Sequence, residues 1–194
     1  MMKVGGSGAP VEVDETFIGG KAKNMHPDKR KLRITRRGAH DKTIVFGILE
    51  RGGRVHATTF PNRTSRTVAP ILKAHIEDGC EVMTDEMTGY NKLRDTYVLQ
   101  VVNHAIEYVS GKVHTNGIEN FWSLLKRGLN GTYVAVEPFH LDRYLDEQMF
   151  RFINRATKKQ NVTDAARFDK VLSQVVEKRL TYAEVIGKTE EAAF

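Results

Sequence analysis

The order in which strand-like and helix-like patterns follow one another constrains the fold of this chain most strongly. Residues 11–18 largely alternate apolar and polar side chains, residues 43–49 form a nearly continuous apolar run, and residues 55–60 complete a hairpin after a Gly-Gly turn. A helix pattern over residues 64–78 follows, and strands and helices then alternate up to residue 155. Three sequential strands followed by alternating units predict a mixed α/β sheet with helices on its faces.

The local signals for helix ends give more detailed predictions. Thr67 is the expected N-cap of the first helix, which places Pro70 in its first turn and Gly79 just past its end. A strongly patterned helix that begins near residue 116 is expected to stop at Gly128. The other predicted elements are strands at 81–84 and 97–102, a short helix through Tyr90 and Leu93, and helices at 116–127, 138–155 and 163–177.

Positive charge is concentrated in one segment of the chain. Residues 21–42 contain nine Lys or Arg and two Asp, a local charge of +7, whereas the whole chain carries +6 with a pI of about 9.4. A basic segment on a nearly neutral body suits a polyanion such as nucleic acid. A solvated loop without a partner is the alternative interpretation.

Cysteine usage and hydropathy exclude several classes of protein. The single cysteine, Cys80, allows no intramolecular disulfide and no C-x-x-C zinc ribbon, and it is expected to pack as a small apolar side chain. No run of about eighteen apolar residues is present, and the start of the chain lacks the apolar region of a signal peptide. We therefore expect a cytoplasmic chain that does not enter a membrane, with a flexible segment over residues 1–10.

Two acidic residues lie at comparable places in the predicted sheet. Asp14 lies within or at the end of the first strand, Asp85 directly follows strand 81–84, and each is followed by a glutamate. Because successive strand residues face opposite sides, one member of each pair is expected to point at a shared site. Carboxylates that meet at strand ends suit a hard cation such as Mg²⁺, whereas pairing with lysine or helix capping is the structural alternative.

The helix predicted from residue 116 has a second candidate group on its polar face. Glu119 and Lys126 are seven residues apart, so they share a face at a distance of about 10 Å and can hold a metal and a phosphate side by side. Asn116 followed by Glu119 also fits a capping box, which is the structural alternative. The apolar stripe opposite comprises Ile118, Phe121, Trp122 and Leu125, which are expected to be core.

Five ordered motifs resemble the transposase domain of a group of bacterial insertion sequences. They are VEVDETFIGGK, VMTDEMTGY, HTNGIENFWSLLKRGLNGTY, HLDRYLDEQMFRFINR and KRLTYAEVIGK, and they extend from about Val11 to Lys188. The resemblance implies a retroviral integrase-like, RNase H-like fold, with a mixed five-stranded sheet and flanking helices over residues 11–156. A C-terminal helical extension over residues 157–194 would follow this domain.

The same resemblance implies a D, D, E/N active site. Asp14 corresponds to the first catalytic residue and Asp85 to the second, and the third lies among residues 116–120. Glu119, thirty-four residues after Asp85, ranks first. Asn116 and Asn120 are rivals, because some branches of the family use Asn at this position. Asp14, Asp85 and Glu119 would hold Mg²⁺ or Mn²⁺, with two ions expected.

The implied reaction is DNA strand cleavage and strand transfer without a covalent enzyme intermediate. The expected partner is double-stranded DNA, both transposon ends and target, and the active form would be a homo-oligomer at the bacterial nucleoid in the cytoplasm. His104 and His114 are candidates for supporting a metal ligand or acting as a general base, although a hydrogen-bonded structural role is the favoured interpretation. The expected DNA contacts are Lys126, Arg127, Lys29, Arg30, Lys31, Arg33, Arg36 and Arg37.

The chain departs from the family pattern at its start. Only thirteen residues precede Asp14, whereas family members usually carry a zinc-ribbon-like or helix-turn-helix module there, so we expect a catalytic domain without this module. Three alternatives stay open at this stage. They are a hydrolytic nuclease on the same fold, an inactive DNA-binding remnant and an RNA-binding module. The last is disfavoured because the sequence lacks the aromatic-rich motif that such modules carry.

Overall fold

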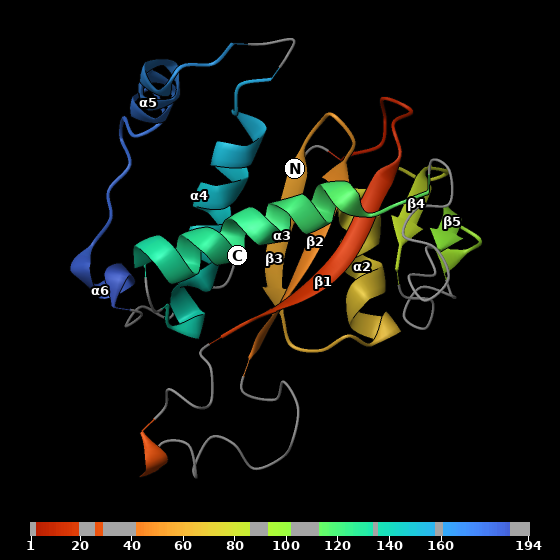
Figure 1. The fold of residues 1–194 in the computed structure, drawn as a ribbon, viewed down its shortest axis with the longest axis horizontal. Coiled ribbons are helices and arrows are strands. Elements are labelled where there is room, and N and C mark those ends of the chain that lie inside the picture. The colour runs from red at the N-terminus through yellow and green to blue at the C-terminus, as the bar shows by residue number, and fades with distance from the viewer. Residues whose placement is uncertain are drawn as a thin grey trace. The chain divides into compact units, whose positions relative to one another are not determined.

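A mixed five-stranded sheet forms the centre of the unit Met1–Ile153 (Figure 1). Its strands are β1 (Val11–Ile18), β2 (Thr43–Glu50), β3 (Val55–Phe60), β4 (Glu81–Thr84) and β5 (Val98–Val101). The spatial order is β3-β2-β1-β4-β5, with antiparallel pairing among β1, β2 and β3 and parallel pairing of β4 with β1 and of β5 with β4. This arrangement confirms the predicted mixed five-stranded sheet.

A second compact unit, Asn154–Phe194, follows the first. It contains α5 (Asp164–Leu172) and α6 (Tyr182–Val185), each with a threonine N-cap whose side chain accepts a backbone hydrogen bond. No helix among the described residues is long and apolar enough to cross a membrane. This computed structural model describes residues 3–19, 26–28, 42–85, 93–101, 113–133, 136–157 and 161–186.

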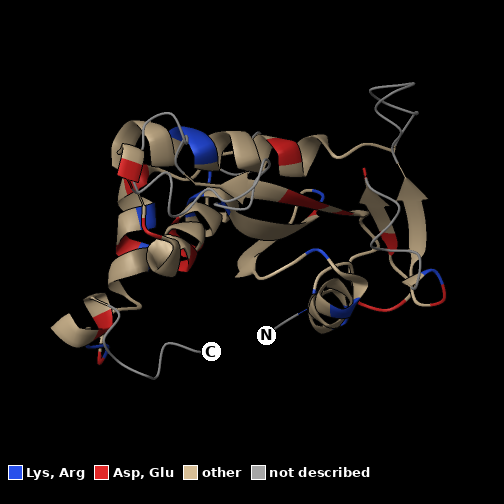
Figure 2. Ribbon diagram, turned by 90° about the horizontal axis from the view of Figure 1, so that it is seen from below, with Lys and Arg blue, Asp and Glu red and all other residues tan. Residues whose placement is uncertain are grey.

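Helices cover both faces of the sheet. Helix α2 (Ser65–His75) packs on one face, and α3 (Asn116–Gly128) and α4 (Leu141–Ile153) pack on the other (Figures 1 and 2). Alternate residues of β1 therefore face different cores, with Val11 and Val13 on the α2 side. The polar residues between and after them, Glu12 and Asp14, face α3.

Helix α2 begins earlier than the sequence predicts, because a different residue forms its N-cap. Thr64 is the N-cap in extended backbone conformation, and Thr67 lies within the helix. The hydroxyl groups of Thr64 and Thr67 both donate to Asn62 Oδ1, at 2.7 Å each, so neither caps the helix. Pro70 consequently lies inside the helix, not in its first turn, and the predictions for Thr67 and Pro70 are wrong.

Helix α3 ends at Gly128, as the sequence predicts, but the backbone stays helical beyond it. Gly128 is its last residue, and the chain runs on into a π-helical turn, η3 (Leu129–Tyr133). Leu129 is buried and its N–H donates to the carbonyls of Leu125 and Lys126, so packing keeps the backbone helical where the glycine alone predicts an end. A short 3-10 turn, η4 (Pro138–His140), then leads into α4.

The first ten residues contain an ordered segment where flexibility was expected. Val4 forms a parallel bridge beside α2, because its N–H donates to His75 O at 2.7 Å and its carbonyl accepts from Glu77 N at 3.0 Å. Its side chain is buried in the α2-side core, against which the partly buried Cys80 also packs. An apolar contact and two backbone hydrogen bonds therefore fix a segment whose small, Gly-rich composition predicts mobility.

Candidate metal centre and active site

Three carboxylates meet at the end of β4. One oxygen atom from each of Asp14, Glu15 and Asp85 lies within 4.8 Å of the other two. The parallel register of β1 and β4 pairs Glu12 with Met83, so Asp14 and Asp85 come to the same level of the sheet. The structure thus brings together the two acids that the sequence singled out.

Glu15 is a member of this carboxylate group that the sequence argument missed. The argument from strand alternation allows only one residue of the Asp14-Glu15 pair to reach the site. However, β4 ends at Thr84, so β1 has no described strand beside it on that edge beyond this level, although β2 continues on the other edge. The longer glutamate side chain brings an oxygen to the same group. The corresponding Glu86 lies outside the described residues.

The carboxylate group brings three acidic side chains close together. Burial, then the nearby charge of Asp85 and, less strongly, that of Glu15 together raise the pKa of Asp14 from 3.8 to about 7. Hydrogen bonds to Asp14 from Glu15 N at 2.7 Å and from Trp122 Nε1 at 2.9 Å act in the opposite direction without cancelling this effect. A set of acidic oxygen donors fits a hard divalent cation such as Mg²⁺ or Mn²⁺.

A glycine in the middle of β2 allows α3 to reach Asp14. Gly47 pairs with Asp14 across the sheet, and a Cβ atom on Gly47 would lie 2.5 Å from the Trp122 ring. The indole therefore crosses β2 at the one place without a side chain and donates to Asp14 Oδ2. A glycine inside the apolar run TIVFGILE was the sequence signal for such a close approach.

A buried carboxylate on β1 holds the start of α3. Glu12 is fully buried, and its Oε2 accepts a hydrogen bond of 2.9 Å from the backbone N–H of Ile118 in the first turn of α3. Its Oε1 accepts from Arg51 Nε at 2.6 Å. A Cβ atom on Gly117 would lie 2.7 Å from Glu12 Oε2, so the glycine is needed for this approach. Glu12 thus caps the helix from across the sheet.

The predicted capping box between Asn116 and Glu119 is wrong, because a neighbouring residue takes the N-cap position. Thr115 is the N-cap and Asn116 is the first residue of α3. The Thr115 hydroxyl donates to Glu119 Oε1 at 3.0 Å, while a strand carboxylate more than 100 residues earlier satisfies the helix N–H. Local spacing alone could not reveal a cap supplied from so far away.

His114 belongs to the group around Glu12. Its Nδ1 lies 3.0 Å from Arg51 Nη2 and 3.5 Å from Glu12 Oε1, and its carbonyl accepts from the same Arg51 nitrogen at 2.6 Å. These contacts place His114 at the foot of α3, where it helps to enclose the buried carboxylate. His104 lies outside the described residues.

The candidates for the third catalytic position differ in where they lie around α3. Asn116, Glu119 and Asn120 are all exposed. Side chains three or four positions apart are neighbours on a helix, so Glu119 and Lys126 flank Trp122 on the side that contacts Asp14. Asn116 and Asn120, six and two positions before Trp122, lie on other sides. Glu119 is not a member of the group within 4.8 Å.

The predicted DNA contacts fall in two places. Lys126 and Arg127 are exposed in the last turn of α3, with the acidic Glu119 in the first turn (Figure 2). The helix therefore carries a cation two turns from a carboxylate, as the spacing predicts. The remaining predicted contacts lie outside the described residues: Lys29, Arg30, Lys31, Arg33, Arg36 and Arg37.

Comparison with known proteins relates the chain to transposases. Residues 5–153 match the model of the ISXO2-like transposase domain family. An uncharacterized transposase-like protein of Haemophilus influenzae is 30% identical over 108 residues, which cover 55% of this chain and 87% of the relative. The catalytic core domain of BIV integrase aligns with a TM-score of 0.48 at 14% identity, over 85% of this chain and 97% of that domain.

Proposed function

The chain belongs to the family of ISXO2-like transposase domains, and from this membership we propose that it catalyses metal-dependent cleavage and joining of DNA strands. The observation that carries the proposal is the group of three carboxylates, in which burial and the neighbouring acids raise the pKa of Asp14 to about 7. A cluster of like charges with one largely buried member is unfavourable unless a cation or a proton relieves it. Such a cluster is expected where an enzyme holds divalent ions.

Asp14 and Asp85 are the proposed principal ligands of Mg²⁺ or Mn²⁺, with Glu15 as a further ligand from the same strand. Bound divalent ions would supply activation of a water or a 3′-hydroxyl group and stabilisation of the leaving oxygen. Trp122 keeps the Asp14 carboxylate oriented through its 2.9 Å hydrogen bond. Lys126, one turn after Trp122, is positioned to contact the phosphate backbone of DNA.

We assign the third catalytic position to Glu119 ahead of Asn116 and Asn120. Glu119 lies beside Trp122 on the ridge of α3 that borders Asp14, and it is the acid in the first turn of that helix. The Thr115 hydroxyl bonds one of its oxygens at 3.0 Å, which restricts its side-chain rotamers. Asn116 and Asn120 are six and two positions from Trp122, so neither is its neighbour at the three- or four-residue spacing of a helix.

Strand transfer joins two DNA ends, so the proposed active form is a homo-oligomer with one carboxylate group in each copy. The proposed substrate is double-stranded DNA of the bacterial nucleoid, in the cytoplasm. The experiment incubates the full chain with supercoiled plasmid, or with oligonucleotides that carry free 3′-hydroxyl ends, in Mg²⁺ or Mn²⁺. Nicked and joined products are expected from the natural chain, and joined products separate a transposase from a purely hydrolytic nuclease.

The variant Asp14→Asn is expected to lose both products and retain DNA binding. Asp95→Asn is the matched control, because it makes the same change of charge at an exposed position of the same unit. Metal-dependent products at full rate from Asp14→Asn would refute the assignment. Salt-sensitive DNA binding with no metal-dependent product from the natural chain would instead identify a DNA-binding remnant.

Metal binding can be measured without catalysis. Trp122 is the single tryptophan of the chain, and its indole bonds Asp14. Tb³⁺ bound to the carboxylate group should therefore emit when the tryptophan is excited, and Mn²⁺ or Mg²⁺ should displace this signal. Asp85→Asn should weaken the emission, whereas Asp95→Asn should not. An unchanged signal in Asp85→Asn would place the ion elsewhere.

A further inference from the structure

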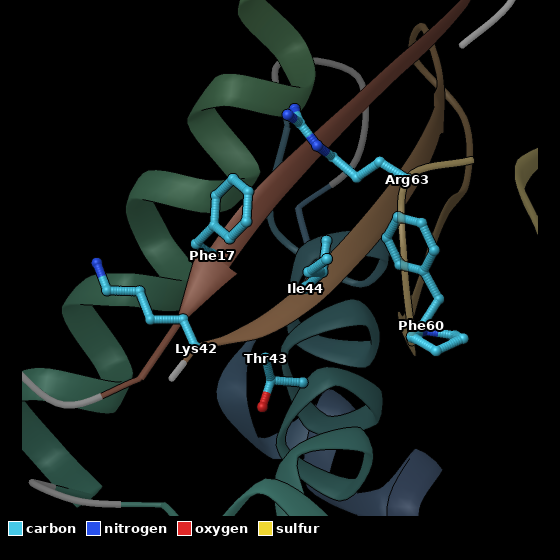
Figure 3. A pocket seen from close by; sticks show the side chains of 7 residues that line it. Phe17, Lys42, Thr43, Ile44, Phe60 and Arg63 are labelled. Atoms are coloured by element: carbon cyan, nitrogen blue, oxygen red, sulfur yellow. The ribbon is translucent and has the colours of Figure 1, made fainter. Parts of the chain in front are cut away.

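A cavity with aromatic and cationic walls lies at the end of β1 and has no role in the proposed chemistry. Its volume is about 570 Å³, and it lies between the end of β1, the start of β2 and the end of β3 (Figure 3). None of the described residues that line it is acidic. The residues that matter for its chemistry are Phe17, Lys42, Thr43, Ile44, Phe60 and Arg63.

The cavity offers a flat surface made of an aromatic ring and a guanidinium group. The Arg63 guanidinium carbon lies 5.5 Å from the centre of the Phe17 ring, and Figure 3 shows the side chain extending toward that ring. Phe60 and Ile44 supply the rest of the apolar wall. Flat aromatic and guanidinium faces bind unpaired nucleic-acid bases by stacking, without strong preference for the base.

Positive charge at the rim suits a phosphate group. Lys42 and Arg63 both line the cavity, and both are exposed. Lys42 is also the last residue of the basic segment 21–42, so the sequence continues the positive charge beyond the cavity. A nucleotide combines a planar base with a phosphate, and 570 Å³ lies within the range of sites for molecules of this size.

The cavity is close to the carboxylate group along a single strand. Glu15 and Phe17 are two residues apart on β1, so their side chains leave the same face of the strand about 7 Å apart. That spacing corresponds to roughly two base steps of DNA at about 3.4 Å each. A strand whose phosphate lies at the carboxylates can therefore present a neighbouring base to the cavity.

We propose that this cavity receives an unpaired nucleotide of the DNA strand next to the bond on which the carboxylate group acts. The base stacks on Phe17 and Arg63, and Lys42 contacts the adjoining phosphate. This assignment rests on the proposed function for the choice of DNA as the partner. Because taking a base out of a duplex costs free energy, the cavity favours single-stranded or frayed DNA over intact duplex.

The experiment measures the affinity of the full chain for a labelled oligothymidine and for a duplex of the same length, by fluorescence anisotropy in EDTA. Phe17→Leu removes the ring and keeps an apolar side chain. It is expected to weaken binding of the single strand about fivefold or more and to leave duplex binding within about twofold. Phe139→Leu is the matched control, because that ring is 58% exposed elsewhere in the same unit.

Two further variants separate stacking from charge. Arg63→Lys keeps the positive charge and removes the planar group, so single-strand affinity should fall about threefold with an unchanged salt dependence. Lys42→Gln should weaken single strand and duplex alike and reduce the slope of affinity against salt by about 0.7 to 0.9. Both residues are exposed, so these variants test the proposal even if Phe17→Leu fails to fold.

The proposal is overturned if folded Phe17→Leu binds the single strand as the natural chain does, or if it loses single strand and duplex equally. Should Phe17→Leu not fold, unchanged single-strand binding by Arg63→Lys overturns it. Absence of any DNA binding by the natural chain overturns it as well. The binding assay needs no cleavage, so the two proposals can fail separately. If the variants weaken single-strand binding but the natural chain gives no metal-dependent products, only the proposed function is refuted. If the natural chain cleaves DNA but the variants bind as it does, only the role of the cavity is refuted.

Discussion

Two carboxylates on the same face of β1, Glu12 and Asp14, have opposite electrostatic surroundings. Glu12 is fully buried, yet Arg51 and a backbone N–H at the start of α3 bond its two oxygens. Asp14 accepts hydrogen bonds from an indole and a backbone N–H, neither of which carries a net charge, and faces two other carboxylates. Burial alone therefore does not decide what a carboxylate does.

The difference shows that the two carboxylates have different roles, because groups of the protein balance the charge of Glu12 in a way that they do not for Asp14. The charge of Glu12 is balanced within the fold, and its role is to fix the first turn of α3. Asp14 has two acidic neighbours instead, and burial together with these charges raises its pKa to about 7. One turn of α3 contacts both carboxylates, through Ile118 and Trp122. These two residues are four apart on the helix, a rise of about 6 Å, which is close to the rise of about 7 Å over two residues of the strand.

The largest expected effect is the loss of DNA cleavage when the Asp14 carboxylate is removed. Asp14→Asn should lower the rate of metal-dependent DNA cleavage by roughly 10³-fold or more, because a ligand of the proposed metal site is lost. In EDTA the same variant should melt at a higher temperature than the natural chain near pH 8, because a repelled charge is removed. Cleavage assays and thermal melting measure the two effects. A variant that is both inactive and less stable would contradict the contrast with Glu12.

The next effect concerns the balanced carboxylate. Glu12→Gln should lower the free energy of unfolding by about 3 to 5 kcal/mol, because it leaves the Arg51 guanidinium and the start of α3 without their anionic partner. Urea denaturation followed by circular dichroism measures it. Glu77→Gln, at an exposed position of the same unit, is the control. If Glu12→Gln and the control are equally stable, Glu12 does not fix the first turn of α3 as proposed.

A smaller effect tests the contact between α3 and β2. Gly47→Ala places a Cβ atom 2.5 Å from the Trp122 ring, so the indole must shift and its bond to Asp14 is strained. We expect a loss of about 2 to 3 kcal/mol in the free energy of unfolding and a change in tryptophan fluorescence. Gly128→Ala is the control, because a Cβ atom there meets no neighbouring atom within 4 Å. Gly52→Ala is unsuitable because Gly52 has a positive φ. Unchanged fluorescence in Gly47→Ala would contradict this contact.

The smallest effect is a dependence of stability on pH in EDTA. The folded chain keeps a proton on Asp14 up to about pH 7, whereas the unfolded chain loses it near pH 3.8, so this group lowers stability as pH rises between these values. We expect on the order of 2 kcal/mol, after allowing for partial solvent screening. Burial and the neighbouring His75 lower the pKa of His56 to about 4, which gives the opposite slope between pH 4 and 6.5.

The measured quantity is therefore the difference in the free energy of unfolding between the natural chain and Asp14→Asn as a function of pH. The contribution of His56 is common to both and cancels in this difference. A difference that stays constant from pH 4 to pH 8 would show that Asp14 titrates near its ordinary pKa. The contrast with Glu12 would then lose its electrostatic basis.

The sequence by itself determined the order of the elements and two members of the site. Strand and helix periods depend on neighbouring residues, so β1 to β4 and the apolar stripe of α3 were predictable, and Ile118, Phe121, Trp122 and Leu125 are buried as expected. Asp14 and Asp85 were predictable because each lies in or just after a strand whose pattern is local. The errors at Thr67 and Pro70 concern the start of a helix, where contacts with other residues outweigh local propensity.

Only the tertiary structure decided which groups contact the Glu12 and Asp14 carboxylates and where the cavity at Phe17 forms. Arg51 and Ile118 reach Glu12 across 39 and 106 residues, and Trp122 reaches Asp14 across 108. Glu15 joins the carboxylate group only because β4 ends beside it. The cavity at Phe17 requires three strands and the residue before a helix N-cap to meet. Electrostatic energy and packing depend on distances between side chains, and these distances exist only after the chain has folded.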